Sequence, residues 1–106
     1  MAEDDAARTR PAPVRVVKDM TITHAEFFRT LQPLLPAGRH QSSADGAIIP
    51  LGDGRVEIRL GAEGARPLGN FRLPRTLVEL RFEGCSPDTV AEFIARFDLR
   101  FRRGGG

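Results

Sequence analysis

The sequence predicts an α+β fold: two helices packed on one face of an antiparallel sheet of about four strands. Two observations carry this prediction. One capped amphipathic helix is expected near each end of the chain, over residues 24–32 and 87–103, and hydrophobicity alternates with a period of two over residues 47–83 between them. The expected order of elements is α-β-β-β-β-α, with the strands joined as a meander because the connections are short.

The first helix has a strong start signal. Thr23 and Glu26 form the T-x-x-E pattern of a capping box, and Ile22 before the cap can staple onto Phe27 inside the helix. Pro33 is expected to end or kink this helix, because proline lacks the N–H that a helix interior needs and restricts the residue before it.

The last helix is the most completely specified element. Ser86 is placed as the N-cap and Pro87 as the first helical residue, where a missing N–H costs nothing. Arginines at 100, 102 and 103 load the last turn with positive charge, which complements the helix dipole. Apolar residues recur at steps of three and four: Val90, Phe93, Ile94, Phe97 and Phe101.

The block between the helices is interpreted as four short strands. They cover residues 47–51, 55–60, 68–73 and 76–82. Turns are expected at 52–54 and 61–64. Pro74 lies between the last two strands, where the turn is expected to be either tight or absent. In the clearest strand, apolar and charged residues alternate, so one sheet face should be apolar and the other charged. Five phenylalanines should meet under the helices: Phe27, Phe28, Phe82, Phe93 and Phe97.

The domain organisation follows from where large apolar residues occur. Residues 1–19 are expected to be a flexible arm, 20–103 a single α+β domain, and 104–106 a flexible glycine tail. Whether residues 14–18 add an edge strand is left open, since their valines allow it.

The composition is that of an ordinary globular domain, with 41% hydrophobic and 28% charged residues. The net charge is only +2, although Lys18 is the only lysine among 16 cationic residues. This arginine bias fits either anion contacts or GC-rich coding, and the second explanation is the simpler one. The chain shows no secretory signal and no apolar run of about 18 residues, so the expected location is the cytoplasm of a bacterium-like cell.

The sequence does not favour an enzyme. The two histidines lack a metal-binding spacing, so no metal or cofactor is expected. His40 lies near serines and Asp45 in the loop 37–46, but one loop lacks the rigid support that a catalytic set requires. Cys85, the only cysteine, precedes a helix N-cap, where a thiol is either activated or packed as a small apolar residue, and we favour packing.

Binding residues are sought among the arginines and the polar loop. Arg66, Arg72 and Arg75 form the least balanced cluster, and Arg39 and His40 lie in the polar loop. These five residues are the candidate binding site. The arginines of the charged sheet face, at 55, 59 and 81, alternate with Glu57 and Glu79 and lack the aromatic neighbours that bind bases by stacking.

The C-terminal residues Arg102 to Gly106 resemble, over these few positions, the diglycine tails of ubiquitin-like and sulfur-carrier proteins. Such a resemblance implies a carrier whose terminal carboxylate is activated. The strand-strand-helix-strand order of those families differs from the order predicted here, so a carrier is the least favoured alternative.

The function predicted from the sequence is a non-catalytic accessory or protein-interaction module. An exposed sheet edge would let it pair with a second copy or with an extended peptide, and Pro50 makes the strand at 47–51 a poor edge for this purpose. The alternative is a weak nucleic-acid or anion binder that acts through the Arg66, Arg72 and Arg75 cluster.

Overall fold

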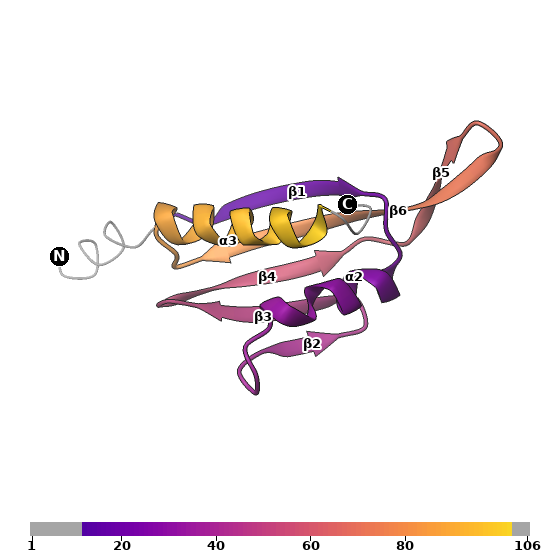
Figure 1. The fold of residues 1–106 in the computed structure, drawn as a ribbon. Helices are drawn as coiled ribbons and strands as arrows, with labels where there is room; N and C mark the ends of the chain where they lie inside the picture. Colours follow the sequence, from indigo (N-terminus) through magenta and orange to yellow (C-terminus); the bar gives the residue numbers. More distant parts are fainter. Residues whose placement is uncertain (1–11, 103–106) are drawn as a thin grey trace.

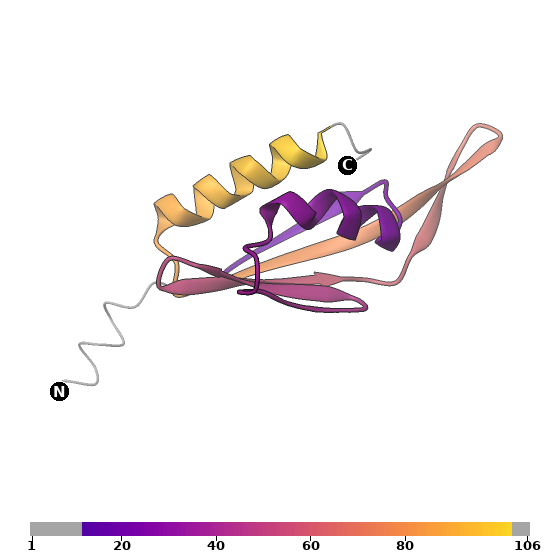
Figure 2. The same cartoon turned by 60° about the horizontal axis from the view of Figure 1, so that its bottom comes forward.

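A computed structural model describes residues 12–102 and confirms the α+β class (Figure 1). In chain order the elements are β1 (Val14–Met20), α2 (His24–Leu31), the 3-10 turn η1 (Gln32–Leu34), β2 (Gln41–Ser43), β3 (Gly46–Leu51), β4 (Gly54–Leu60), β5 (Gly64–Leu68), β6 (Phe71–Glu83) and α3 (Pro87–Phe101). The six strands are antiparallel and follow the order β1-β6-β4-β3-β2, with β5 paired to the first part of β6. Figure 2 shows that α2 and α3 cover the same face of this sheet, as predicted.

The sheet has two more strands than the four that the sequence predicts. Residues 14–20 form β1, which pairs with β6 from Val14 opposite Phe82 to Met20 opposite Thr76. The arm predicted to end at residue 19 therefore overlaps a strand, and the rest of that arm, residues 1–11, lies outside the described residues. The second additional strand, β2, is entirely polar and forms a hairpin with the start of β3. Both strands are defined by their partners rather than by an apolar pattern of their own.

The predicted bounds of the strand 68–73 are wrong, and of the two alternatives at Pro74 the structure has the one without a turn. Residues 64–68 form β5, the turn lies at residues 69–70, and β6 runs through Pro74 without interruption. Residues 71–75 of β6 pair only with β5, whereas β1 joins β6 at Thr76 and β4 joins it at Val78. A proline is compatible with this segment because a strand that is paired on one side leaves half of its N–H groups without a partner in any case.

The helix boundaries follow the predicted signals. The Thr23 hydroxyl accepts a hydrogen bond from the Glu26 amide at 3.1 Å, and the Ser86 hydroxyl accepts one from the Thr89 amide at 3.1 Å. Helix α2 ends directly before the 3-10 turn that contains Pro33, where the sequence predicts a stop. Helix α3 ends at Phe101, two residues before the predicted boundary, and the glycine tail 104–106 lies outside the described residues.

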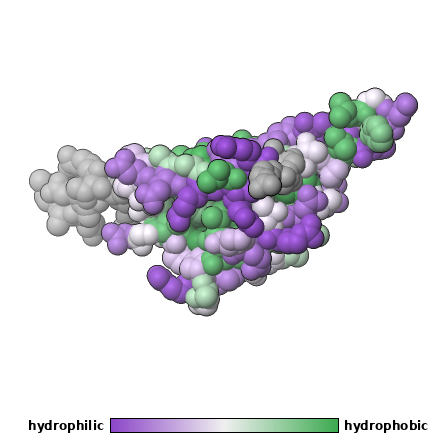
Figure 3. Space-filling view, in the orientation of Figure 1, coloured by the Kyte–Doolittle hydropathy of each residue, from purple (hydrophilic) through white to green (hydrophobic). Residues whose placement is uncertain are grey.

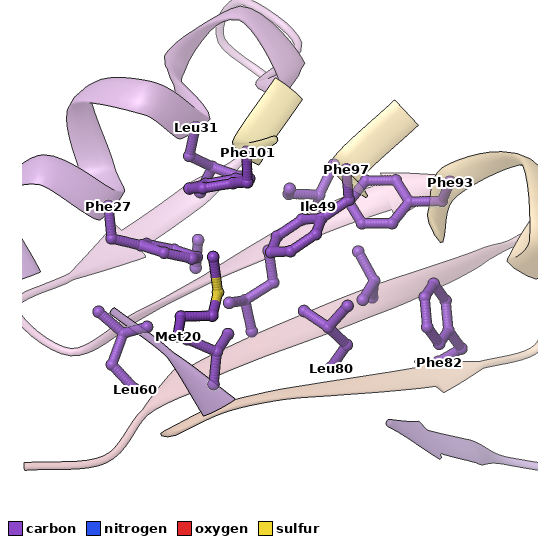
Figure 4. Packing of buried hydrophobic residues seen from close by; sticks show 14 of the residues in the cluster. Met20, Phe27, Leu31, Ile49, Leu60, Leu80, Phe82, Phe93, Phe97 and Phe101 are labelled. Atoms are coloured by element: carbon purple, nitrogen blue, oxygen red, sulfur yellow. The ribbon is translucent and has the colours of Figure 1, made fainter. Parts of the chain in front are cut away.

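The core is a chain of phenylalanine rings that joins the sheet to both helices (Figure 4). Phe82 of β6 contacts Phe93 edge-on, with ring centroids 5.8 Å apart. Phe97 and Phe101 of α3 stack at 4.4 Å, and Phe101 stacks on Phe27 of α2 at 4.9 Å. Phe28 packs edge-on against Phe27, so all five predicted core rings are in this cluster and Phe101 joins them. Six of the seven phenylalanines are thereby accounted for.

The opposite face of the sheet carries alternating charges, as predicted. The strand register places Glu57 beside Arg81 and Arg59 beside Glu79. Arg55 contacts the carboxylates of both Glu57 and Glu83 at 3.0–3.2 Å. Pairs of this kind on a solvated surface each contribute little stability, and their mixed signs leave this face without a strong net charge.

Two glycines allow the turn between β3 and β4 to cross the connection between β6 and α3. Gly54 lies in the first segment and Gly84 in the second. A β-carbon added at Gly84 would lie 3.3 Å from the Cα of Gly54. Gly84 also has φ +70°, a conformation that glycine adopts without steric cost. This crossing fixes where α3 starts above the sheet.

Candidate functional site

The hairpin formed by β5 and β6 projects beyond the rest of the sheet (Figures 1 and 2). Its pairing runs from Gly64 opposite Arg75 to Leu68 opposite Phe71. The neighbouring strands do not follow it, because their pairing with β6 begins only at Thr76 and Val78. Within the described residues, 64–75 therefore form a two-stranded hairpin with no third strand on either side.

The tip of this hairpin is apolar. Leu68 is 61% exposed and Phe71 is 71% exposed, and the two residues lie opposite each other. Figure 3 shows the resulting hydrophobic patch at the end of the projection. Gly69, at the first position of the two-residue turn, has φ +60°, as a type II′ hairpin turn requires. An apolar pair in this position contributes nothing to the core, so the fold itself does not explain it.

The predicted arginine cluster lies on the same hairpin. Arg66 is in β5, and Arg72 and Arg75 are in β6. Arg75 donates two hydrogen bonds to the Asp19 carboxylate of β1, from Nε at 3.0 Å and from Nη2 at 2.9 Å. Arg66 donates to the same carboxylate. Arg72 makes no ion pair within residues 12–102.

The Asp19 carboxylate braces the base of the hairpin against β1. The hydrogen bond from Arg75 is the main cause that lowers the pKa of Asp19, and the charges of Arg66 and Arg75 act in the same direction. Because the pKa is lowered in the folded state, the brace is present at neutral pH and is lost as the pH falls through this lowered value. Asp19 therefore orients the hairpin and offsets part of the positive charge of the cluster.

Replacement of Asp19 by asparagine is expected to loosen the hairpin without unfolding the domain. The neutral amide cannot hold two guanidinium groups, so backbone amides of residues 64–75 should exchange with deuterium faster at pH 7. Wild-type protein in strong acid should show the same change, whereas the exchange of β4 should stay slow. Asp53→Asn, in a turn without an ion pair in the described structure, is the matched control. Equal exchange of the hairpin in Asp19→Asn and wild type would refute the bracing role.

The loop residues Arg39 and His40 do not join the arginine cluster. His40 Nδ1 donates a hydrogen bond to the Pro36 carbonyl at 2.9 Å, and the Arg39 amide donates to the same oxygen at 3.2 Å. Both contacts stabilise the loop after η1, which lies away from the hairpin in Figures 1 and 2. The five residues proposed as one site are thus divided between the loop and the hairpin. On the hairpin, Arg66 and Arg75 meet at Asp19, whereas the strand register places Arg72 on the opposite face.

The polar residues of the loop do not form a catalytic set. Ser43 hydrogen-bonds to Asp45 at 3.2 Å, and His40 contacts neither of them through a hydrogen bond in the described structure. The other histidine, His24, donates from Nε2 to the Gly61 carbonyl at 2.8 Å. Within residues 12–102, no three histidine, cysteine, aspartate or glutamate side chains come together as metal ligands would.

Cys85 is buried between β4 and the end of β6. Its sulfur lies 3.6 Å from the carbonyl oxygens of Arg55 and Glu83, to which the thiol can donate. Burial raises the pKa of Cys85 above its ordinary value, opposite to the shift that a reactive thiol needs. The position before the α3 N-cap therefore does not activate the thiol.

Alkylation of Cys85 is expected to be slow in the native protein. At pH 7 to 8 iodoacetamide should label it far more slowly than a model thiol peptide, because the sulfur is both shielded and protonated. Labelling should become rapid in denaturant, and the native rate should still be rising above the ordinary thiol pKa. Mass spectrometry of timed samples measures both rates. Rapid native labelling with an inflection below the ordinary pKa would contradict this assignment.

Phe71 is not among the residues predicted to bind a partner. The sequence places it inside the predicted strand 68–73, and most of the other phenylalanines are expected in the core. The available signal was the dipeptide Gly69-Asn70, which is typical of a two-residue hairpin turn. A turn at this point makes Leu68 and Phe71 the closing pair of a hairpin. Their exposure depends in addition on how far the neighbouring strands extend, which the turn does not reveal.

No family model matches this chain, and the comparisons with curated proteins and with solved structures found no match either. Neither helix described in residues 12–102 has the length and hydrophobicity that a bilayer-spanning helix requires. The features that indicate a function are therefore those of the molecular surface, where the apolar tip and the arginines lie on one projecting hairpin.

Proposed function

We propose that this protein is a non-catalytic interaction module that binds a partner protein through the tip of the β5–β6 hairpin. The observation that carries the proposal is the exposure of Leu68 and Phe71, paired at the end of a projecting element. Burial of apolar surface contributes about 25 cal/mol per Å². Large anchors that fill a pocket of the partner typically dominate the energy of an interface.

The hairpin is suited to this role because its geometry is set before binding. Strand β6 continues from the tip into the sheet, where β1 and β4 flank it. Asp19 fixes the base of the hairpin through Arg66 and Arg75. A preorganised element loses less conformational entropy on binding than a flexible loop.

The charge beside the tip indicates the chemistry of the partner. Arg72 follows Phe71 on the opposite face of the hairpin and has no ion-pair partner in the described structure, so a partner that encloses the tip would meet both side chains. A recess with apolar walls and carboxylates at its rim would accept the two apolar side chains and pair with this guanidinium. We therefore propose a partner surface of this kind.

A nucleic-acid binder is the second candidate, because all three predicted arginines lie on the projecting hairpin. Asp19 offsets part of their charge, and Phe71 is the only exposed aromatic side chain in the described part of the chain. A titration of a random oligonucleotide across a salt series tests this candidate. Binding that weakens with salt and is lost in Arg72→Gln would favour it over a protein partner.

The test of the main proposal starts with a photo-reactive amino acid at position 71 of the full chain, in cells that naturally produce it. A second chain carrying the same group at position 57, on the charged sheet face, is the control for nonspecific cross-linking. The protein that is cross-linked from position 71 alone is then purified and titrated with wild type and variants. The proposal expects a single such protein.

In this titration Phe71→Ser should weaken binding about 30-fold, which corresponds to roughly 2 kcal/mol for a residue that anchors an interface. Leu99→Ser is the matched control, because Leu99 is a similarly exposed apolar residue on α3 and should leave the affinity within twofold. Equal affinity of Phe71→Ser and wild type would refute the proposal. The absence of any cross-link specific to position 71 would refute it as well.

A further inference from the structure

Strand β1 forms one edge of the sheet described by residues 12–102, with β6 on one side and none of the described strands on the other. It is seven residues long and contains no proline, so half of its backbone N–H and C=O groups face outward without a strand partner. Val17, at its middle, points to the charged sheet face and is 51% exposed. A free edge of this length is a template for pairing with another strand.

We propose that two copies of this chain pair through their β1 edges, antiparallel and about a twofold axis at Val17. In this register Val17 lies opposite Val17 of the partner subunit, and Val14 lies opposite Met20 of the partner subunit. The two sheets then form one continuous sheet with all helices on the same face. The interface uses no residue of the hairpin tip, so this proposal goes beyond the proposed function and can fail independently of it.

Charge supports this register. Within one chain Arg15 lies directly opposite Arg81, and its guanidinium binds the carboxylate of Glu79, the diagonal neighbour. Asp19 is held by Arg66 and Arg75, so a contact with Arg15 across the dimer would add an opposite-charge pair to two groups that already have partners. The proposed pairing places Arg15 opposite Asp19 of the partner subunit, and by symmetry the reverse contact also forms. Another register that keeps the helices of both subunits on the same face has its twofold axis at Lys18. That register would place Lys18 opposite Lys18 of the partner subunit. The register centred on Val17 is also the one that pairs all seven residues of both strands.

A hollow at the strand edge supports the same arrangement. It has a volume of about 450 Å³ and lies between β1 and the end of α3. Its lining includes Asp19, which points to the charged face of the sheet. Met20, Phe97 and Phe101 line it from the core side. Because residues from both faces of the sheet line the hollow, it opens at the free edge of β1. The proposed register directs Val14 of the partner subunit into this space. Val14 is 37% exposed in the single chain, so part of its side chain remains to be covered.

Lys18 is the residue that would oppose such an interface, because an inward-pointing charge on an edge strand normally prevents pairing. Here its ammonium group binds the Asp98 carboxylate of α3 at 2.7 Å, and its side chain is largely covered. The charge is therefore held by its own subunit. The aliphatic part of Lys18 is left to face Val16 of the partner subunit across the new pair.

The experiment measures the oligomeric state of the full chain by sedimentation velocity over a concentration series. We expect a dimer that dissociates on dilution. Val17→Lys should weaken dimerisation at least tenfold, because it places two ammonium groups opposite each other at the axis. Leu77→Lys, on the same face but one strand further in, should leave the dissociation constant within about threefold. A chain that stays monomeric at all concentrations would overturn the proposal.

A cysteine variant tests the register. Under mild oxidation Val17→Cys should form a disulfide-linked dimer, because the twofold axis brings the two positions together. Arg59→Cys, exposed in the middle of the sheet, should not, and buried Cys85 is the native background. A dimer that neither cross-links through position 17 nor responds to Val17→Lys uses another surface and would refute the proposal. Phe71→Ser should dimerise normally, which separates this test from that of the hairpin.

Discussion

Replacement of Phe97 by alanine is expected to lower the free energy of unfolding by about 3–5 kcal/mol. The Phe97 ring is fully buried and lies in contact with the rings of Phe27, Phe93 and Phe101. Its removal leaves a cavity at the point where both helices meet above the sheet. A domain of this size typically has a total stability of roughly 5–15 kcal/mol, so the variant would lose between about a fifth and all of it.

Urea denaturation followed by far-UV circular dichroism measures this loss, since the chain contains no tryptophan or tyrosine for fluorescence. Phe71→Ala removes the same atoms from an exposed position and should change the stability by less than about 0.5 kcal/mol. All chains are compared at one protein concentration, because dimerisation would shift the transition. Equal losses at positions 97 and 71 would contradict the division of the phenylalanines into core and tip.

Replacement of Gly54 by alanine is expected to destabilise the domain by about 3 kcal/mol or more, at the upper end of overpacking effects. The added β-carbon would overlap the carbonyl oxygen of Glu83 and lie 2.5 Å from the carbonyl carbon of Gly84. Both are backbone atoms, which cannot rotate away as a side chain can. The turn between β3 and β4 would have to separate from the connection that leads into α3.

Thermal unfolding measures the effect of this change. A loss of 3 kcal/mol corresponds to a fall in Tm of roughly 12–24 °C for a domain of this size. Gly64→Ala is the matched control, because a β-carbon there would lie 3.7 Å from the Arg75 carbonyl, an ordinary contact. That variant should unfold within about 4 °C of wild type. A similarly small shift for Gly54→Ala would show that the two segments do not cross as closely as described.

The helices were predictable because their signals are local. Thr23 and Ser86 each cap an amide three residues further along the chain, so a short stretch of sequence contains both the donor and the acceptor. The same holds for Pro33, which marks the end of α2 through its own missing N–H. The apolar stripe of α3 likewise repeats within the helix and required no knowledge of the sheet.

The missed strands depend on remote partners. Strand β1 is stabilised by pairing with residues 76–82, more than fifty positions away, and its two adjacent valines break the alternation that would reveal a strand. Strand β2 has no apolar residue and exists because a hairpin turn places it against β3. Whether a turn occurs at Pro74 was left open, because the compatibility of proline with β6 depends on which segments of that strand are paired on both sides.

The candidate site was predictable in part for the same reason. Arg66, Arg72 and Arg75 are close in sequence, so a hairpin carries all three, although its register places Arg72 on the face opposite to Arg66 and Arg75. Their partner Asp19 comes from β1, and only the paired sheet places it at the base of the hairpin. The exposure of Phe71 follows from where β1 and β4 stop pairing with β6, which is a property of the whole sheet.

The continuity of β6 has a mechanical consequence. A pull on the tip along this strand acts on residues 78–82, where β6 is paired with both β1 and β4. Antiparallel hydrogen bonds lie across the strand direction, so such a force shears both ladders, and their bonds must rupture together rather than unzip one by one. The tip is thus connected to a strand that is paired on both sides, and tension on a bound partner would be resisted by two ladders of hydrogen bonds at once.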